Sequence, residues 1–100
     1  MRSLAFATLV LAGSVQAALA AGAAPPLPAA AAPCANCHGT DGRHQGAIPA
    51  IAGRPAPLLA DTLRRFRADA VPDATVMPRL VKGLTETEID QVAAYFSTIR

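Results

Sequence analysis

The chain has 100 residues, with nine lysines and arginines against seven aspartates and glutamates, which gives a formal net charge of +2. This length limits the chain to one small domain with a modest hydrophobic core. The near balance of charges argues against nucleic-acid binding and against strong electrostatic steering of a charged partner.

The first twenty residues have the pattern of a secretory signal peptide. Arg2 supplies a short positive region, residues 4–12 are apolar, and residues 18–20 form a small-x-small cleavage site, with 15–17 as a competing site. The apolar stretch is shorter than the roughly 20 residues that a transmembrane helix needs, which disfavours the alternative of an uncleaved membrane anchor. We therefore predict a signal peptide over 1–20, export to the periplasm, and no membrane span after cleavage.

An Ala/Pro-rich leader over 21–30 is expected to precede a domain over 31–100. At its start, Cys34-Ala35-Asn36-Cys37-His38 has the spacing that attaches a c-type haem. Two cysteines three apart near the end of a short helix can each bond one vinyl group of the same porphyrin, and the adjacent histidine then reaches the iron. This motif predicts one covalent haem c, with thioethers at Cys34 and Cys37 and His38 as an axial ligand of the iron.

Other interpretations of the motif fit less well. A structural zinc site needs about four protein ligands, and beyond the motif only His44 offers another good nitrogen or sulfur donor. A thioredoxin-like redox pair requires a βαβ pattern, which the sequence lacks. A disulfide across two intervening residues would leave His38 without a role. Haem is therefore the preferred interpretation.

A glycine-rich stretch and a helix are expected next. Residues 39–53 contain four glycines and one proline, which is the chemistry of turns rather than of a regular element. Prolines at 55 and 57 then favour a helix start. Leu59, Leu63, Phe66 and Ala70 recur on one helical face, so this helix is predicted to end near Ala70.

The second axial ligand is sought in the segment 71–84, which is predicted to be a loop. Met77 lies there, 39 residues after His38 and directly before Pro78. A lone methionine is commonly core filler. A thioether in this place can instead reach the opposite face of the iron, since His/Met coordination is an established haem arrangement. We predict that Met77 is the second axial ligand and that His44 is a surface residue.

The C-terminal helix has the clearest signals. Thr85 and Glu88 form a capping box, and Glu86 adds a favourable charge in the first turn. A stripe of apolar residues follows at helical spacing and is expected to face the core: Ile89, Val92, Ala93, Phe96 and Ile99. No segment alternates with a period of two, so the fold is predicted to be all-α.

Together these features resemble a class I c-type cytochrome. The resemblance covers approximately residues 32–99 and rests on Cys34-x-x-Cys37-His38-Gly39, Ile48-Pro49 with Gly53, Val76-Met77, and the Gly83-Leu84-Thr85 start of the last helix. The chain is most similar to small periplasmic monohaem cytochromes, including the cytochrome subunit of flavocytochrome c sulfide dehydrogenases. The resemblance implies the small class I cytochrome c fold, with three to four helices wrapped around the haem.

The resemblance also implies roles for further residues. The carbonyl of Pro49 would accept a hydrogen bond from His38 and so support that ligand. The C-terminal helix would cross the helix that bears the haem motif. Independently of the resemblance, Arg54 and Arg79 are expected to be solvated surface residues, with contacts to the haem propionates as the alternative. Many relatives carry tyrosine in place of Leu58 and glycine in place of Asp69.

The expected function is one-electron transfer without catalysis. Iron held by His38 and Met77 has no open position, and the sequence shows no acid–base or nucleophile constellation. Redox partner proteins are expected to dock at the exposed haem edge near Cys34 and Cys37. Two alternatives remain: a haem subunit of a larger oxidoreductase, for example beside a flavoprotein, and a haem-based ligand sensor with a labile sixth site.

Overall fold

The computed structural model describes residues 25–100, and the predicted signal peptide lies outside them. A short 3₁₀ helix, η1 (Ala29–Ala31), leads directly into α1 (Ala32–His38). Three further helices follow: α2 (Ala56–Arg67), α3 (Met77–Val81) and α4 (Glu86–Thr98). The described part of the chain has no strand, so the all-α prediction is confirmed.

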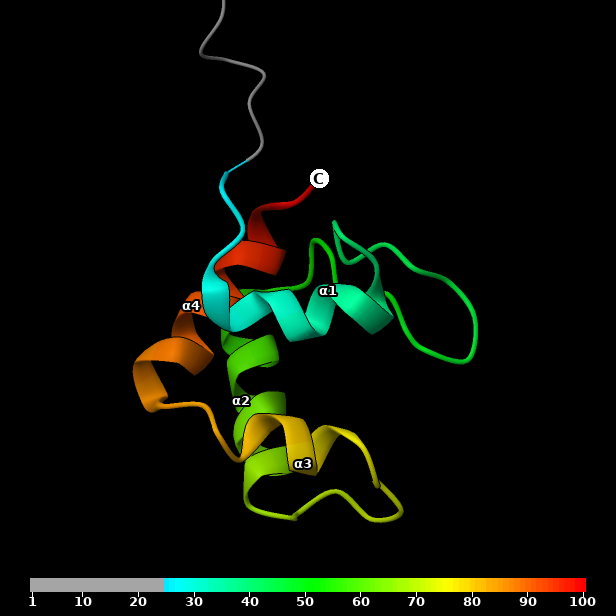
Figure 1. The fold of residues 1–100 in the computed structure, drawn as a ribbon, viewed down its shortest axis with the longest axis vertical. Coiled ribbons are helices and arrows are strands. Elements are labelled where there is room, and N and C mark those ends of the chain that lie inside the picture. The colour runs from blue at the N-terminus through cyan, green and yellow to red at the C-terminus, as the bar shows by residue number, and fades with distance from the viewer. Residues whose placement is uncertain (1–24) are drawn as a thin grey trace, which may run out of the picture.

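The core forms where α2, α4 and η1 meet. Its eight buried hydrophobic residues come from all the elements except α1: Ala31, Ala60, Leu63, Val81, Ile89, Val92, Ala93 and Phe96. In Figure 1, α1 crosses near one end of α2 while α3 lies near the other end. Helix α4 packs against both α2 and η1. The two segments that carry the predicted iron ligands are therefore separated along α2.

Helix α4 begins as the sequence predicts. The Thr85 hydroxyl oxygen accepts a hydrogen bond from the Glu88 backbone N–H at 3.2 Å, and the Thr85 N–H donates to the Glu88 carboxylate at 2.8 Å. This reciprocal pair satisfies two backbone donors at the start of the helix. The predicted stripe from Ile89 to Phe96 is buried in the core, whereas Ile99 lies one residue beyond the helix and is half-buried.

Helix α2 ends at Arg67, three residues before the predicted end. Its last turn closes with two hydrogen bonds, from the Asp69 N–H to the Phe66 carbonyl at 3.1 Å and from the Ala70 N–H to the Arg65 carbonyl at 2.9 Å. Asp69 takes a left-handed conformation with φ of 54°. This geometry is the Schellman motif, which usually has glycine in this place. The apolar period therefore continues past the true end of the helix.

The prediction of a loop around Met77 is wrong, because Met77 begins α3. Pro78 stands in the first turn, where its missing N–H removes no helical hydrogen bond. The Arg79 and Leu80 N–H groups both donate to the Val76 carbonyl, at 3.1 and 3.2 Å. Pro78 is itself buried. A helix of five residues is too short to show an apolar period, which explains why the sequence pattern did not reveal it.

Residues 39–55 have no regular secondary structure, in agreement with their glycine content. The segment is nevertheless held in place by its backbone. The Gly42 carbonyl accepts hydrogen bonds from the N–H groups of Ile51 at 2.8 Å and Ala52 at 3.0 Å. The Gly53 N–H donates to the Phe96 carbonyl at 2.8 Å. This loop is thus tied to the C-terminal helix and carries Pro49 past the end of α1.

Candidate functional site

His38 is the last residue of α1, and its side chain is 8% exposed. Its Nδ1 lies 2.6 Å from the carbonyl oxygen of Pro49. Because a carbonyl can only accept, Nδ1 carries the proton in this contact. The neutral imidazole then has its lone pair on Nε2. Histidines that bind a metal through one ring nitrogen characteristically donate a hydrogen bond from the other, which fixes the tautomer in this way.

The two cysteines lie one helical turn apart on α1, and neither forms a disulfide. Cys34 is half-buried and Cys37 is exposed. Burial raises the pKa of the Cys34 thiol, and the proximity of Cys37 raises it further. A protonated thiol is a poor nucleophile toward disulfides, so the Cys34 sulfur stays available for a thioether bond.

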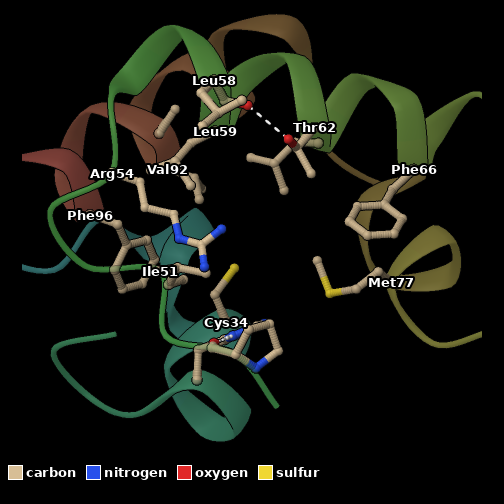
Figure 2. A pocket seen from close by; sticks show the side chains of 14 residues that line it. Cys34, Ile51, Arg54, Leu58, Leu59, Thr62, Phe66, Met77, Val92 and Phe96 are labelled. Carbon is tan, nitrogen blue, oxygen red and sulfur yellow. Dashed lines mark hydrogen bonds between the residues drawn. The ribbon is translucent and has the colours of Figure 1, made fainter. Parts of the chain in front are cut away.

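Two adjoining cavities open beside these residues, with volumes of about 240 and 310 Å³. Both are lined by Cys34, His38, Pro49 and Met77. Figure 2 shows Cys34 on α1 and Met77 on α3 turned toward the same space. The structure therefore brings together four of the five predicted site residues around one hollow, and the fifth, Cys37, lines the second cavity.

The first cavity has largely apolar walls. Helices α2 and α4 supply Leu59, Leu63, Phe66, Val92 and Phe96, and the loop before α2 supplies Ile51. Thr62 also lines it, but its hydroxyl donates to the Leu58 carbonyl at 2.8 Å (Figure 2). The flat apolar face of a porphyrin matches such walls, because its burial removes hydrocarbon surface from water on both sides.

The donor set and the cavity fit a covalently held haem. Two free thiols, an imidazole with Nε2 available and a thioether all border the same apolar hollow. Among residues 25–100, no group of three or more histidine, cysteine or carboxylate side chains is arranged to hold a metal ion by itself. Within the same range, no helix is long and apolar enough to cross a membrane.

The structure also shows where Arg54, Arg79 and His44 lie relative to the two cavities. Arg54 lines the first cavity, whereas Arg79 lines neither cavity. His44 is exposed and also lines neither cavity, although its backbone N–H donates to the His38 carbonyl at 2.8 Å. Ile51 and Thr62 were not identified as site residues from the sequence. The only available signal for Ile51 was an apolar side chain within a glycine-rich segment.

Comparison with known proteins identifies the family. Residues 21–96 match the family profile described as cytochrome c oxidase, cbb3-type, subunit III. The chain is 39% identical over 66 residues to the cytochrome subunit of sulfide dehydrogenase from Chlorobaculum tepidum, which covers 66% of this chain and 59% of that protein.

The chain is also similar to two other proteins. The thiosulfate dehydrogenase electron acceptor of Thiomonas intermedia is 39% identical over 80 residues, covering 78% of this chain and 35% of that protein. Cytochrome c-554(548) of Halomonas halodenitrificans is 32% identical over 68 residues, covering 65% of this chain and 82% of that protein. The chain thus spans 59% and 35% of the length of the first two relatives and most of the third. It belongs to the c-type cytochromes, the haem c proteins that carry electrons.

Proposed function

We propose that this chain shuttles single electrons between proteins of the periplasm, with His38 and Met77 as the axial ligands of its haem iron. When bound, haem c supplies the Fe(III)/Fe(II) couple. The observation that carries the proposal is the contact between His38 Nδ1 and the Pro49 carbonyl, which leaves Nε2 as the nitrogen for iron. Met77 borders the same two cavities as His38 and offers a thioether as the second ligand.

Each remaining site residue then has a defined task. Cys34 and Cys37 hold the haem covalently, and Pro49 fixes the orientation of the His38 ring. The apolar side chains of α2 and α4 keep water away from the iron. Low polarity around the iron disfavours the additional positive charge of Fe(III), so these walls and the thioether ligand raise the reduction potential.

The second cavity supports a docking face for redox partners. Three exposed apolar side chains line it, namely Ile48, Val76 and Leu80, with exposed fractions of 36%, 60% and 45%. Cys37, also exposed, lies among them and marks the thioether edge of the haem. Electron-transfer encounters are commonly small and weak, which suits a patch of this extent.

A carbon monoxide titration of the reduced holoprotein tests the axial ligation. Because both axial positions are filled, the wild-type protein is expected to bind carbon monoxide poorly, while Met77→Ala binds it readily through the vacated site. Arg79→Ala is the control, because Arg79 is exposed on the same helix and lines neither cavity, and it is expected to behave as wild type. Ready binding by the wild-type protein would instead support the ligand-sensor alternative.

The relationship to a cytochrome subunit of sulfide dehydrogenase supports a second candidate, a haem subunit that works beside a flavoprotein. Both candidates use the same iron couple and differ only in whether the partner stays bound. Purification of the tagged haem protein from its own periplasm distinguishes them. A flavin-containing protein in constant ratio to haem indicates a permanent subunit, whereas haem protein alone indicates a free shuttle.

A further inference from the structure

An ion pair on the protein surface joins the ends of α2 and α3. The ammonium nitrogen of Lys82 lies 2.8 Å from the Asp69 carboxylate. Asp69 is the second residue after α2, and Lys82 is the C-cap residue of α3. The pair therefore brings together the two ends of the segment 70–81. This segment contains Met77, which is the first residue of α3.

The part of this segment that precedes α3 has few other attachments. Within the described part of the chain, the one hydrogen bond that residues 71–75 form runs from the Ala74 N–H to the Val71 carbonyl at 3.4 Å, inside the segment itself. Figure 1 shows residues 68–76 as an open turn that leads from the end of α2 back to α3. A stretch with so few hydrogen bonds opens more readily than the core does. The position of Met77 therefore depends on how α3 is held.

Helix α3 is held from within and from the surface. Pro78 and Val81 are buried, whereas Met77 is half-buried and lines both cavities. The ion pair of Asp69 and Lys82 adds a link to α2 at the far end of this short helix. Because Met77 begins α3, a shift of α3 away from α2 moves Met77 out of the cavities and separates Lys82 from Asp69.

We propose that Asp69 and Lys82 are positioning residues for Met77, and that their ion pair keeps its thioether within reach of the iron. The inference rests on the function proposed above, because it takes Met77 as an axial ligand. The side chains of Lys82 and Asp69 are 55% and 61% exposed, so the pair has a small effect on an equilibrium. We expect the pair to suppress the state in which Met77 has left the iron by about two- to fivefold.

An imidazole titration of the oxidised holoprotein measures that state. Imidazole binds only iron that Met77 has left, so its apparent affinity rises with the fraction of molecules in that state. The free base is neutral, so the loss of one surface charge does not by itself attract or repel it. The proteins compared are wild type, Asp69→Asn, Lys82→Gln and the double variant. Asparagine keeps the shape of Asp69 and tolerates its left-handed φ of 54°.

We expect each single variant to bind imidazole about two- to fivefold more tightly than wild type does. The double variant is expected to bind no more tightly than the single variants, because both substitutions remove the same contact. Two matched controls, Asp73→Asn and Arg79→Gln, are expected to bind as wild type does. Asp73 is an exposed carboxylate with φ of 64°, Arg79 is an exposed cation of α3, and neither forms an ion pair among residues 25–100.

Single variants that bind imidazole as wild type does, or effects that add up in the double variant, would overturn the inference. Chemical denaturation of the same samples separates positioning from general stability, since a lower midpoint with unchanged imidazole affinity contradicts the positioning role. Met77→Ala separates the two proposals. If wild type binds imidazole as tightly as Met77→Ala does, the axial ligation is disproved and the inference with it. If Met77→Ala alone binds more tightly than wild type, only the role of the ion pair is disproved.

Discussion

At the scale of single residues, the site depends on the hydrogen bond between His38 Nδ1 and the Pro49 carbonyl. The Pro49 oxygen holds the proton of His38 on Nδ1, and the same contact keeps the ring in a fixed orientation. Pro49 has this position because the loop 39–55 is fastened by hydrogen bonds to Gly42 and to the C-terminal helix. The orientation of the His38 ring is therefore set by the backbone hydrogen bonds that hold this loop in place.

Gly42 is the residue that most directly holds the loop 39–55 against the core. Its φ is 72°, and a Cβ added there would lie 2.7 Å from the Phe96 ring and 3.0 Å from Ile51. Gly42→Ala therefore forces both a strained backbone and a displaced core side chain. We expect it to lower the free energy of unfolding of the holoprotein by about 2 kcal/mol or more, measured by chemical denaturation.

Gly83→Ala is the matched control for this prediction. A Cβ at Gly83 would meet no atom within 4 Å. The change is expected to alter stability by no more than about 0.5 kcal/mol. Similar losses for the two variants would show that the loop is not held against Phe96 as described.

At the scale of elements, α2 and α4 are joined by charges as well as by the core. Arg64 contacts both Glu86 and Asp90 at 2.8 Å, and Arg67 pairs with Glu86 and donates to the Leu84 carbonyl at 3.2 Å. The hydrogen bonds from Arg67 first, and then from Arg64, lower the pKa of the Glu86 carboxyl below its ordinary 4.5. Glu86 thus serves the start of α4 and the junction between the helices.

The lowered pKa of Glu86 predicts an acid-dependent stability. Since the folded pKa lies below the unfolded one, the stabilisation is complete above about pH 4.5 and is lost as the pH falls through the folded value. Glu86→Gln is expected to be less stable than wild type at neutral pH, with the difference shrinking in acid. Unfolding curves recorded at neutral and at acid pH measure the difference in stability between Glu86→Gln and wild type.

Asp61→Asn provides the control, because Asp61 is exposed on α2 and has no ion pair among residues 25–100. The difference in stability between Asp61→Asn and wild type should change little over the same pH range. A stability difference for Glu86→Gln that stays constant from neutral to acid pH would contradict the role given to the ion pairs.

Whether a feature could be predicted from the sequence depends on whether neighbouring residues or residues far apart in the chain determine it. The capping box of Thr85 and Glu88 and the haem motif at Cys34–His38 are local, so the sequence reveals both. The end of α2 depends on whether Asp69 takes a left-handed conformation, which an apolar period does not report.

Other features depend on contacts between distant residues. The Arg64 pairs link residues 22 and 26 positions apart, and the place of Arg54 and Ile51 on the cavity wall depends on the path of the whole loop 39–55. Periodicity and short motifs contain no information on such paths. The residues proposed as ligands could therefore be chosen from the sequence, but most of the walls around them could not.

At the scale of the whole molecule, the protein part of the core is small. Three of its eight buried residues are alanines, and Cys34, Leu59, Phe66 and Met77 are only partly buried beside it. An apolar macrocycle in the two cavities would cover these half-buried side chains and add to the core. A haem between α1 and α3 would explain why these helices lie near opposite ends of α2 (Figure 1).

The central claim is that sulfur from Met77 and nitrogen from His38 hold the iron from opposite sides. The most direct measurement is the absorption spectrum of the oxidised holoprotein, compared with that of Met77→Ala. We predict a weak red band of a sulfur–iron bond in the wild-type spectrum, retained in Arg79→Ala and lost in Met77→Ala. A colourless wild-type protein, or a Met77→Ala spectrum identical to that of wild type, would contradict the account.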